Sequence, residues 1–201
     1  ALVVGALTGE ELAAGNRDVS HIYFLLTDPD FGECSTDSPK PNHECSTRDE
    51  FQNTLDTVLR NWRGKDQLVF YFTGHGRIIG NTYCLQVGFD KDELLPFSNL
   101  LTDLQVRGVR RAILILDTCY SGAAAKVKAS EVLPLLDQYN LPKGIAVVAS
   151  SRATEPSLEL PDGSSSVFTH LLCQGLQTGL GGKSTTDGYI TVQDIVDYIS
   201  G

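Results

Sequence analysis

The 201-residue chain has no methionine, one tryptophan and few positive charges for its length. Its 16 lysines and arginines stand against 25 aspartates and glutamates, which gives a net charge of −9. A protein that tracks nucleic-acid phosphates needs dense positive charge, so this balance argues against direct nucleic-acid binding and favours basic substrates. No apolar run reaches the roughly 18 residues of a membrane span and no secretory leader is visible. The expectation is a soluble, cytoplasmic protein with no membrane contact.

The sequence also lacks internal repeats, low-complexity tracts and a His/Cys spacing typical of zinc sites. Cys34 and Cys45 lie in a polar stretch, each within the tetrapeptide Glu-Cys-Ser-Thr, where a disulfide or a metal contact is conceivable. Because cytosolic proteins rarely keep disulfides, we favour two free surface thiols. Cys84 and Cys173 have apolar neighbours, so we expect them to pack in the core.

The residues that are present alternate between apolar strands and amphipathic helices, which is typical of one α/β domain built in layers. With 41% hydrophobic residues, the chain can bury a substantial core. Thr47 and Glu50 have the spacing of a capping box, and residues 30–47 are expected to form a long loop with at most a short strand near 43–45. Strands are expected near residues 2–5, 67–72, 83–88, 112–116 and 145–149. Helices are expected near residues 17–27, 48–62, 95–107, 130–138, 165–177 and 192–199.

Two glycine-containing motifs close two of the expected strands. His75 lies in Thr-Gly-His-Gly after the apolar run 68–72, and Cys119 lies in Asp-Thr-Cys-Tyr-Ser-Gly after the run 112–116. The carboxyl ends of parallel strands meet at one edge of a sheet, so we expect these two residues to lie close together. An imidazole can support a thiolate nucleophile and then protonate a leaving amine. The backbone N–H groups of Gly76 and Cys119 are candidates for an oxyanion hole.

At these residues the chain resembles the caspase-like family of cysteine peptidases, which includes metacaspases, bacterial orthocaspases and CHAT-type bacterial domains. His75 precedes Cys119 by 44 residues, close to the roughly 50 found in caspases, although the caspase QAC signature is absent. Taken alone, a buried cysteine is more often an inert hydrophobe, and a histidine is more often a satisfied polar residue. The order, strand context and spacing together favour a catalytic pair. Further segments extend the likeness over nearly the whole chain, at 2–5, 12–18, 25–29, 146–151, 167–169 and 187–192.

The resemblance implies a caspase-like three-layer α/β sandwich with a mostly parallel central sheet flanked by helices. Residues 1–201 then form one peptidase domain. Because the chain begins at Ala1 and has no methionine, we expect either a processed product or a segment of a longer protein, and we favour the segment. The implied activity is that of a cysteine endopeptidase that uses His75 and Cys119 on protein substrates in bacterial defence, stress or cell-death signalling. A sensor or adaptor domain or an activating partner is expected to regulate it. The alternative is a catalytically silent caspase-fold scaffold, since one fold hosts many functions.

Asp117 lies two residues before Cys119, where the resemblance to metacaspases implies an acidic residue that lines the S1 pocket. Charge-assisted bidentate hydrogen bonds offset the desolvation of a guanidinium, so cleavage after Arg, then Lys, is predicted. The alternative is that Asp117 only caps a turn or the following helix.

The segment after the last expected strand supplies further substrate-binding candidates. Ser150 and Ser151 are expected to give backbone contacts to an extended substrate. Glu155 or Asp162 could add a second carboxylate to the S1 pocket, although most surface acids simply face water.

A cofactor is not expected. Some family members need calcium, and Asp90, Asp92 and Glu93 form a small acidic cluster. The cluster lacks the spacing of an EF-hand loop, so a solvated turn is favoured. We therefore expect no metal or other cofactor, with calcium activation left open.

Overall fold

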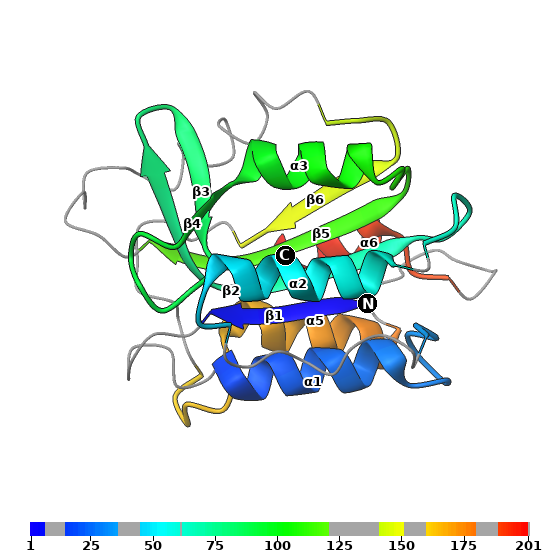
Figure 1. Ribbon diagram of the computed structural model, residues 1–201. Coiled ribbons are helices and arrows are strands. Elements are labelled where there is room, and N and C mark those ends of the chain that lie inside the picture. Colours follow the sequence, from blue (N-terminus) through cyan, green and yellow to red (C-terminus); the bar gives the residue numbers. More distant parts are fainter. Residues whose placement is uncertain are drawn as a thin grey trace.

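The computed structural model describes residues 1–6, 15–35, 45–60, 62–120, 141–150, 160–179 and 189–200, and of Ala6, Cys119, Tyr120 and Ser200 it describes the backbone. In this part of the chain a six-stranded sheet lies between two layers of helices (Figure 1). The strands are β1 (Leu2–Ala6), β2 (Leu68–Ile79), β3 (Thr82–Gln86), β4 (Leu94–Pro96), β5 (Ala112–Tyr120) and β6 (Ile145–Ala149). The helices are α1 (Gly15–Thr27), α2 (Arg48–Leu59), α3 (Phe97–Val106), α5 (Val167–Thr178) and α6 (Val192–Ser200).

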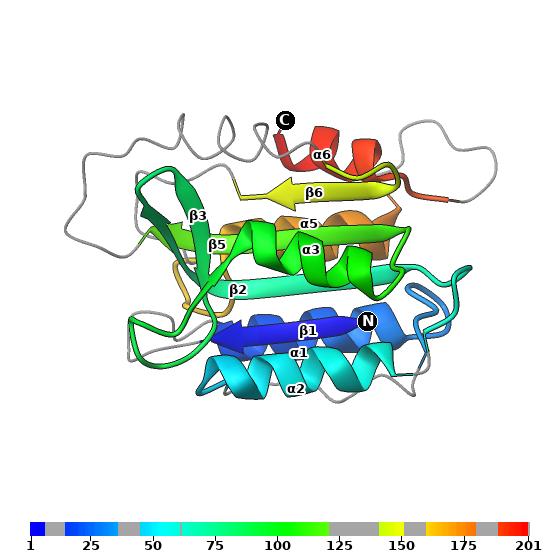
Figure 2. The ribbon, with the colours of Figure 1, turned by 45° about the horizontal axis from the view of Figure 1, so that its top comes forward.

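The three-layer α/β sandwich is confirmed. Helices α1, α5 and α6 cover one face of the sheet, and α2 and α3 cover the other (Figures 1 and 2). The helix expected near residues 130–138 lies outside the described residues. None of the helices in the described ranges is both long and apolar enough to cross a membrane.

The sheet is mixed, so the expectation of a mostly parallel sheet was wrong. β1, β2, β5 and β6 pair in parallel, whereas β3 pairs antiparallel with both β2 and β4. The reason is a hairpin whose two-residue turn, Gly80-Asn81, directly joins β2 to β3, with Gly80 at φ 61°. Glycine adopts this left-handed conformation without steric cost, and a two-residue turn can join only antiparallel strands.

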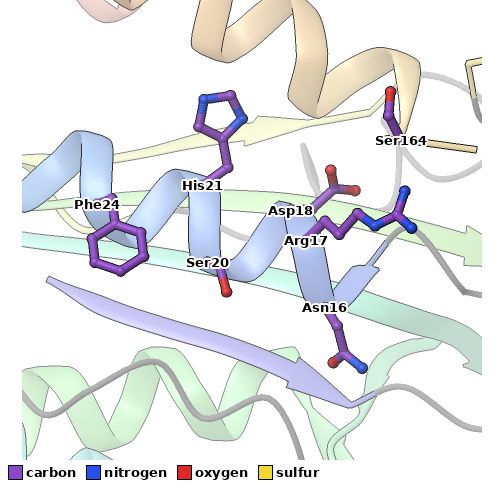
Figure 3. Close-up of a pocket in the computed structure, with 7 residues that line it drawn as sticks. All are labelled: Asn16, Arg17, Asp18, Ser20, His21, Phe24 and Ser164. Carbon is purple, nitrogen blue, oxygen red and sulfur yellow. The ribbon is translucent and has the colours of Figure 1, made fainter.

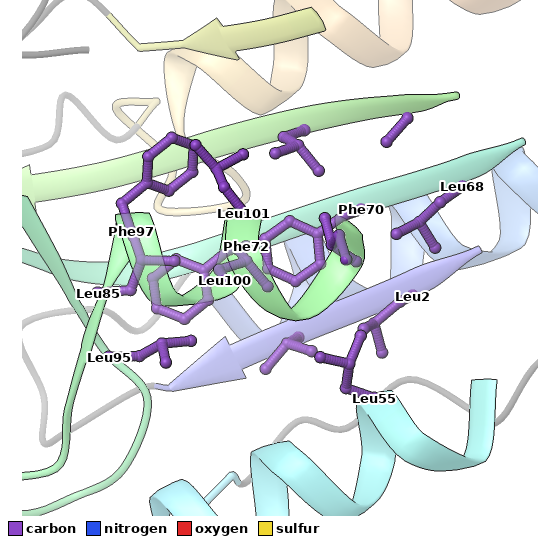
Figure 4. Packing of buried hydrophobic residues seen from close by; sticks show 14 of the residues in the cluster. Leu2, Leu55, Leu68, Phe70, Phe72, Leu85, Leu95, Phe97, Leu100 and Leu101 are labelled. Atoms are coloured by element: carbon purple, nitrogen blue, oxygen red, sulfur yellow. The ribbon is translucent and has the colours of Figure 1, made fainter. Parts of the chain in front are cut away.

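β2 is buried on both faces because its side chains alternate between two cores. Leu68, Phe70 and Phe72 pack towards α2 and α3, and Figure 4 shows this cluster around the two phenylalanine rings. Val69 and Tyr71 pack towards α1, α5 and α6. A central strand covered on both sides reads as a continuous apolar run, which is why the sequence indicated it clearly.

Half of the predicted capping box at the start of α2 is confirmed, and the returning bond from Glu50 reaches Ser46 instead of the N-cap residue Thr47. Thr47 Oγ1 accepts a hydrogen bond from the backbone N–H of Glu50 at 3.1 Å, and Glu50 Oε2 accepts from the N–H of Ser46 at 2.9 Å. Glu93 Oε2 accepts from the N–H of Arg48 at 2.8 Å. One member of the acidic cluster therefore holds its loop to the positive end of a helix, a favourable place for a carboxylate.

The expectation of two surface thiols was wrong for Cys45, whose side chain is fully buried. Burial, together with the charges of Glu50 and Glu93, raises the pKa of this thiol to about 12, so it is inert at neutral pH. Cys34 is half-buried, and Cys84 and Cys173 pack in the core as expected. These four cysteines are all free thiols.

Candidate active site

The two sequence motifs lie side by side on neighbouring strands. β2 and β5 pair in parallel register, with His75 opposite Cys119 and Thr73 opposite Asp117. Adjacent strands lie about 4.8 Å apart, and register partners belong to the same face of a sheet. The imidazole of His75 is buried, with 6% of its surface exposed. The pairing therefore brings together the two positions expected to form a catalytic dyad, at the carboxyl end of both strands.

On the side of β2 that faces away from β5, the neighbouring strand changes at His75. On that side β1 ends with Ala6 opposite Gly74, and β3 takes over with Leu85 opposite Gly76. His75 is the single position between the two pairings, so its place in the sheet is fixed mainly by β5.

Gly76 lies where a side chain would be tightly packed. A Cβ atom at this position would lie 3.0 Å from Tyr83 Oη and 3.3 Å from Thr118 Cβ. These two neighbours hold each other, because Tyr83 Oη and Thr118 Oγ1 are 2.8 Å apart and hydrogen-bonded. A side chain at residue 76 would push into this pair next to His75. The use of the Gly76 and Cys119 N–H groups as an oxyanion hole stays a prediction.

Asp117 lies two pairs of residues before the His75/Cys119 pair, and its carboxylate is held by hydroxyl groups. The side chain is 3% exposed. Ser166 Oγ donates to Asp117 Oδ2 at 2.5 Å, and Thr169 Oγ1 donates to the same oxygen at 2.9 Å. The side chain of Ser150 also bonds to Asp117. In the described part of the chain these donors are all neutral, and no lysine or arginine forms an ion pair with Asp117.

The proton positions in this cluster follow from the donor count. The hydroxyl of Thr169 has one proton and gives it to Asp117, so the 2.7 Å contact with Tyr71 Oη must be donated by Tyr71. Burial raises the pKa of Asp117 above its ordinary value, and the hydroxyl donors partly oppose this shift. Burial and the nearby charges of Asp117 and Asp18 raise the pKa of Tyr71 well above its usual range, so its hydroxyl keeps its proton.

A second buried carboxylate, Asp18, joins the same cluster and was missed by the sequence analysis. It lies in the first turn of α1 with 1% of its surface exposed. Its Oδ2 accepts from the N–H of Ser166 at 3.0 Å, and its Oδ1 accepts from the hydroxyl of Ser165. The two carboxylates thus both bond to Ser166, the N-cap residue of α5. The signal in the sequence is that this acidic residue lies on the apolar face of α1, together with Ile22 and Leu25.

Asp18 also borders an open pocket beside α1. Arg17 lies at this pocket and its Nη1 donates to the Gly163 carbonyl at 3.2 Å. Figure 3 shows Asp18 and Arg17 on the side of α1 near Ser164. The other residues that line the pocket are Asn16, Ser20, His21, Phe24 and Ser164.

The remaining predicted substrate-binding residues have different outcomes. Ser151 and Glu155 lie outside the described residues. The N–H of Ser150 donates to the Leu116 carbonyl at 2.9 Å and so extends the sheet, which leaves its substrate contact a prediction. Asp162 is exposed and its Oδ1 accepts from the N–H of Ser164 at 3.0 Å, so it does not join the buried carboxylates.

Comparison with known proteins agrees with this geometry. A family model described as "Caspase domain" matches residues 1–200. A search of curated protein sequences gave no match. The order of the strands, the helices on both faces and the whole-chain family match lead to one conclusion. The chain belongs to the caspase domain family of cysteine peptidases.

Proposed function

We propose that this chain is a cysteine endopeptidase that cleaves proteins after arginine and, less well, after lysine. Cys119 and His75 act as the dyad. The thiolate of Cys119 attacks the scissile carbonyl carbon, and the N–H groups of Gly76 and Cys119 receive the oxyanion. His75 then gives its proton to the leaving amine, and water hydrolyses the acyl-enzyme to release the acid and restore the thiol. The register of His75 with Cys119 supports this assignment.

The observation that carries the choice of substrate is the environment of Asp117. This buried carboxyl group is bonded by neutral hydroxyls and, in the part of the chain described, has no cationic partner. A guanidinium or ammonium group that enters beside it gains a charge-assisted hydrogen bond, which offsets the desolvation of both charges. An aspartate at P1 would meet repulsion there. Asp18, which accepts from the N–H of Ser166, the residue whose hydroxyl bonds to Asp117, adds a second carboxylate nearby.

Other parts of the proposal follow from the family resemblance. We propose that Ser150, Ser151 and Glu155 contact the substrate, and that a sensor or adaptor domain or an activating partner controls the enzyme. The biological setting we propose is bacterial defence, stress or cell-death signalling. We propose no resident cofactor, and calcium is included in the assay because some members of the family need it.

The test is a panel of fluorogenic peptides with Arg, Lys, Asp, Leu or Met at P1, assayed with and without calcium. Cys119→Ala and His75→Ala should abolish turnover. Asp117→Ala should lower kcat/KM for the Arg substrate by about 100-fold, because it removes the charge that faces the substrate. Asp103→Ala, on α3 and the opposite face of the sheet, is the matched control and should leave activity unchanged.

The outcomes separate three cases. A preference for Asp at P1 would contradict the acidic pocket while leaving the dyad in place. A silent panel in which Cys119 still reacts with an arginyl chloromethyl ketone would indicate a latent protease that needs its activator. A silent panel with an unreactive Cys119 would support the scaffold alternative instead.

A further inference from the structure

We propose that Ser166 and Thr169 are positioning residues that hold the Asp117 carboxylate in one orientation and thereby set the discrimination between arginine and lysine at P1. This inference rests on the proposed function, because it assumes that Asp117 faces a basic P1 side chain. The two residues lie at the start of α5 and belong neither to the dyad nor to the S1 carboxylate itself.

The two hydroxyls have no freedom to point elsewhere. Ser166 is the N-cap of α5, and its Oγ accepts from the N–H of Thr169 at 3.0 Å while its proton goes to Asp117. The hydroxyl of Thr169 accepts from Tyr71 and gives its proton to Asp117. Each hydroxyl therefore has one acceptor role and one donor role already assigned. The carboxylate is bonded to groups that are themselves fixed by β2 and by the first turn of α5.

Both hydroxyls bond to the same carboxylate oxygen. Oδ2 of Asp117 accepts from Ser166 and Thr169, and a carboxylate oxygen has about two lone-pair sites. Oδ1 is consequently the oxygen left for the bond from the Ser150 side chain and, with its remaining acceptor capacity, for a ligand. A guanidinium holds its donors in a rigid plane, whereas an ammonium can rotate its three donors towards an oxygen in many orientations. An arginine should therefore depend on the fixed orientation of this carboxylate more than a lysine does.

The hydroxyls also control the charge of Asp117. Among the described residues, Tyr71 from β2 interacts with the charge of Asp117, Asp18 from α1 lies near the same tyrosine, and His75 is two pairs of residues further along the strands. Towards Asp117, α5 and the end of β6 present hydroxyl groups. Burial raises the pKa of Asp117, and the bonds from Ser166 and Thr169 lower it. Loss of one bond should raise the pKa further and so narrow the pH range in which the carboxylate is ionised.

The experiment uses Thr169→Val, which keeps the shape of the side chain and removes the donor. Thr169→Ser keeps the hydroxyl and should behave like the wild type. Thr178→Val is the matched control, since Thr178 lies on the same helix and its hydroxyl donates to the exposed Gln174 carbonyl. If Thr169→Val does not fold, Ser166→Gly replaces it, because glycine is also accepted at an N-cap and lacks the donor.

Two readouts decide the inference. A carbon-13 NMR titration of the Asp117 carboxyl, assigned with Asp117→Asn, should show a higher pKa in Thr169→Val than in the wild type or Thr178→Val. In kinetics, the ratio of kcat/KM for Arg over Lys substrates should fall about fivefold in Thr169→Val, through a change in KM rather than kcat. The acid limb of the pH profile of kcat/KM for the Arg substrate should move to higher pH in the same variant.

An unchanged Asp117 titration, or an equal loss for both substrates, would overturn the positioning role. If the wild type does not cleave after arginine at all, the proposed function fails. The NMR titration still decides whether Ser166 and Thr169 hold Asp117, because it needs no substrate.

Discussion

Gly76 shows how closely packing at a single residue controls the region around His75. In Gly76→Ala the new methyl group meets Tyr83 Oη at 3.0 Å, so we expect a loss of about 1–3 kcal/mol in the free energy of unfolding. Tyr83→Phe removes that oxygen, and the double variant should lose less than the sum of the two single losses. Urea unfolding of the four proteins measures this. Gly64→Ala, with nothing within 4 Å of the new methyl group, is the control.

Additive losses in this cycle would mean that the Tyr83 hydroxyl does not set the cost of a side chain at residue 76. The ring edge of Tyr83, with Cε2 at 3.1 Å, and Thr118 Cβ at 3.3 Å would then be the limiting contacts.

Asp117 should destabilise the fold as pH rises. Its pKa in the folded chain lies above the ordinary 3.8, so between these two values the folded chain holds a proton that the unfolded chain has lost. Stability from this group is therefore present at low pH and is lost as pH rises through the raised pKa. We expect the difference in unfolding free energy between the wild type and Asp117→Asn to decrease from about pH 4 upwards, as measured by urea unfolding.

Asp194 gives a comparison of opposite sign. Hydrogen bonds from Thr191 lower the pKa of this exposed carboxyl, so its contribution is present above the ordinary pKa and is lost as pH falls. The difference between the wild type and Asp194→Asn should therefore increase with pH. The same sign for both variants would contradict the assignment of Asp117.

At the residue scale, the sequence indicated the site side chains that lie in motifs, and it did not indicate Asp18, which lies outside any motif. His75, Cys119 and Asp117 follow apolar runs, so the carboxyl ends of strands could be inferred for them. Asp18 lies inside a helix, and only α5, distant in sequence, supplies the bonds that make its burial tolerable. A partner that far along the chain leaves no local pattern.

The first turn of α2 is hydrogen-bonded to the loop before β4. Thr47→Ala removes the oxygen that accepts from the Glu50 N–H, and we expect a loss of about 1 kcal/mol in unfolding free energy. Thr57→Ala is the matched control, since Thr57 lies on the exposed side of the same helix and bonds to the Asn53 carbonyl. It should be neutral or slightly stabilising because alanine is a good helix former. Equal losses in urea unfolding would show that helix propensity, not the cap, was responsible.

At the scale of elements, most helices and strands could be predicted, and the errors have physical causes. The expected strands ended at residues 72 and 116, where the apolar runs end, whereas β2 and β5 continue to Ile79 and Tyr120. Polar and small residues continue as strand there because β2 and β5 pair with each other beyond the apolar runs. β4 has three residues, too few for a periodic pattern. Because β4 ends at Pro96, α3 begins at Phe97 and not at the expected residue 95. The Gly80-Asn81 turn was the available signal for the hairpin.

The whole molecule should open from its edge inwards. β2 and β5 are paired on both sides, whereas among the described strands β6 pairs with β5 alone. We expect backbone amides at 70–72 and 114–116 to exchange with solvent most slowly, at a free energy near that of global unfolding, and those at 146–148 to exchange faster. Hydrogen exchange with mass spectrometry measures this. Equal protection of β6 would mean that another strand covers its outer edge.

At this scale the layered architecture was predictable, since alternating strands and helices permit few other arrangements. The direction of β3 and β4 was not, because a strand has the same period of two whether it pairs parallel or antiparallel. Only the short turn distinguishes the two cases.

The change of neighbour beside His75 divides the domain into two parts that can vary separately. The β3–β4 hairpin meets β2 from Gly76 onwards, whereas the register of His75 with Cys119 is set on the opposite side, by β5. An insertion or deletion in the hairpin therefore leaves the alignment of the dyad positions unchanged. Evolution or protein engineering can therefore change β3 and β4, on that side of His75, without changing the alignment of the two positions expected to form the dyad.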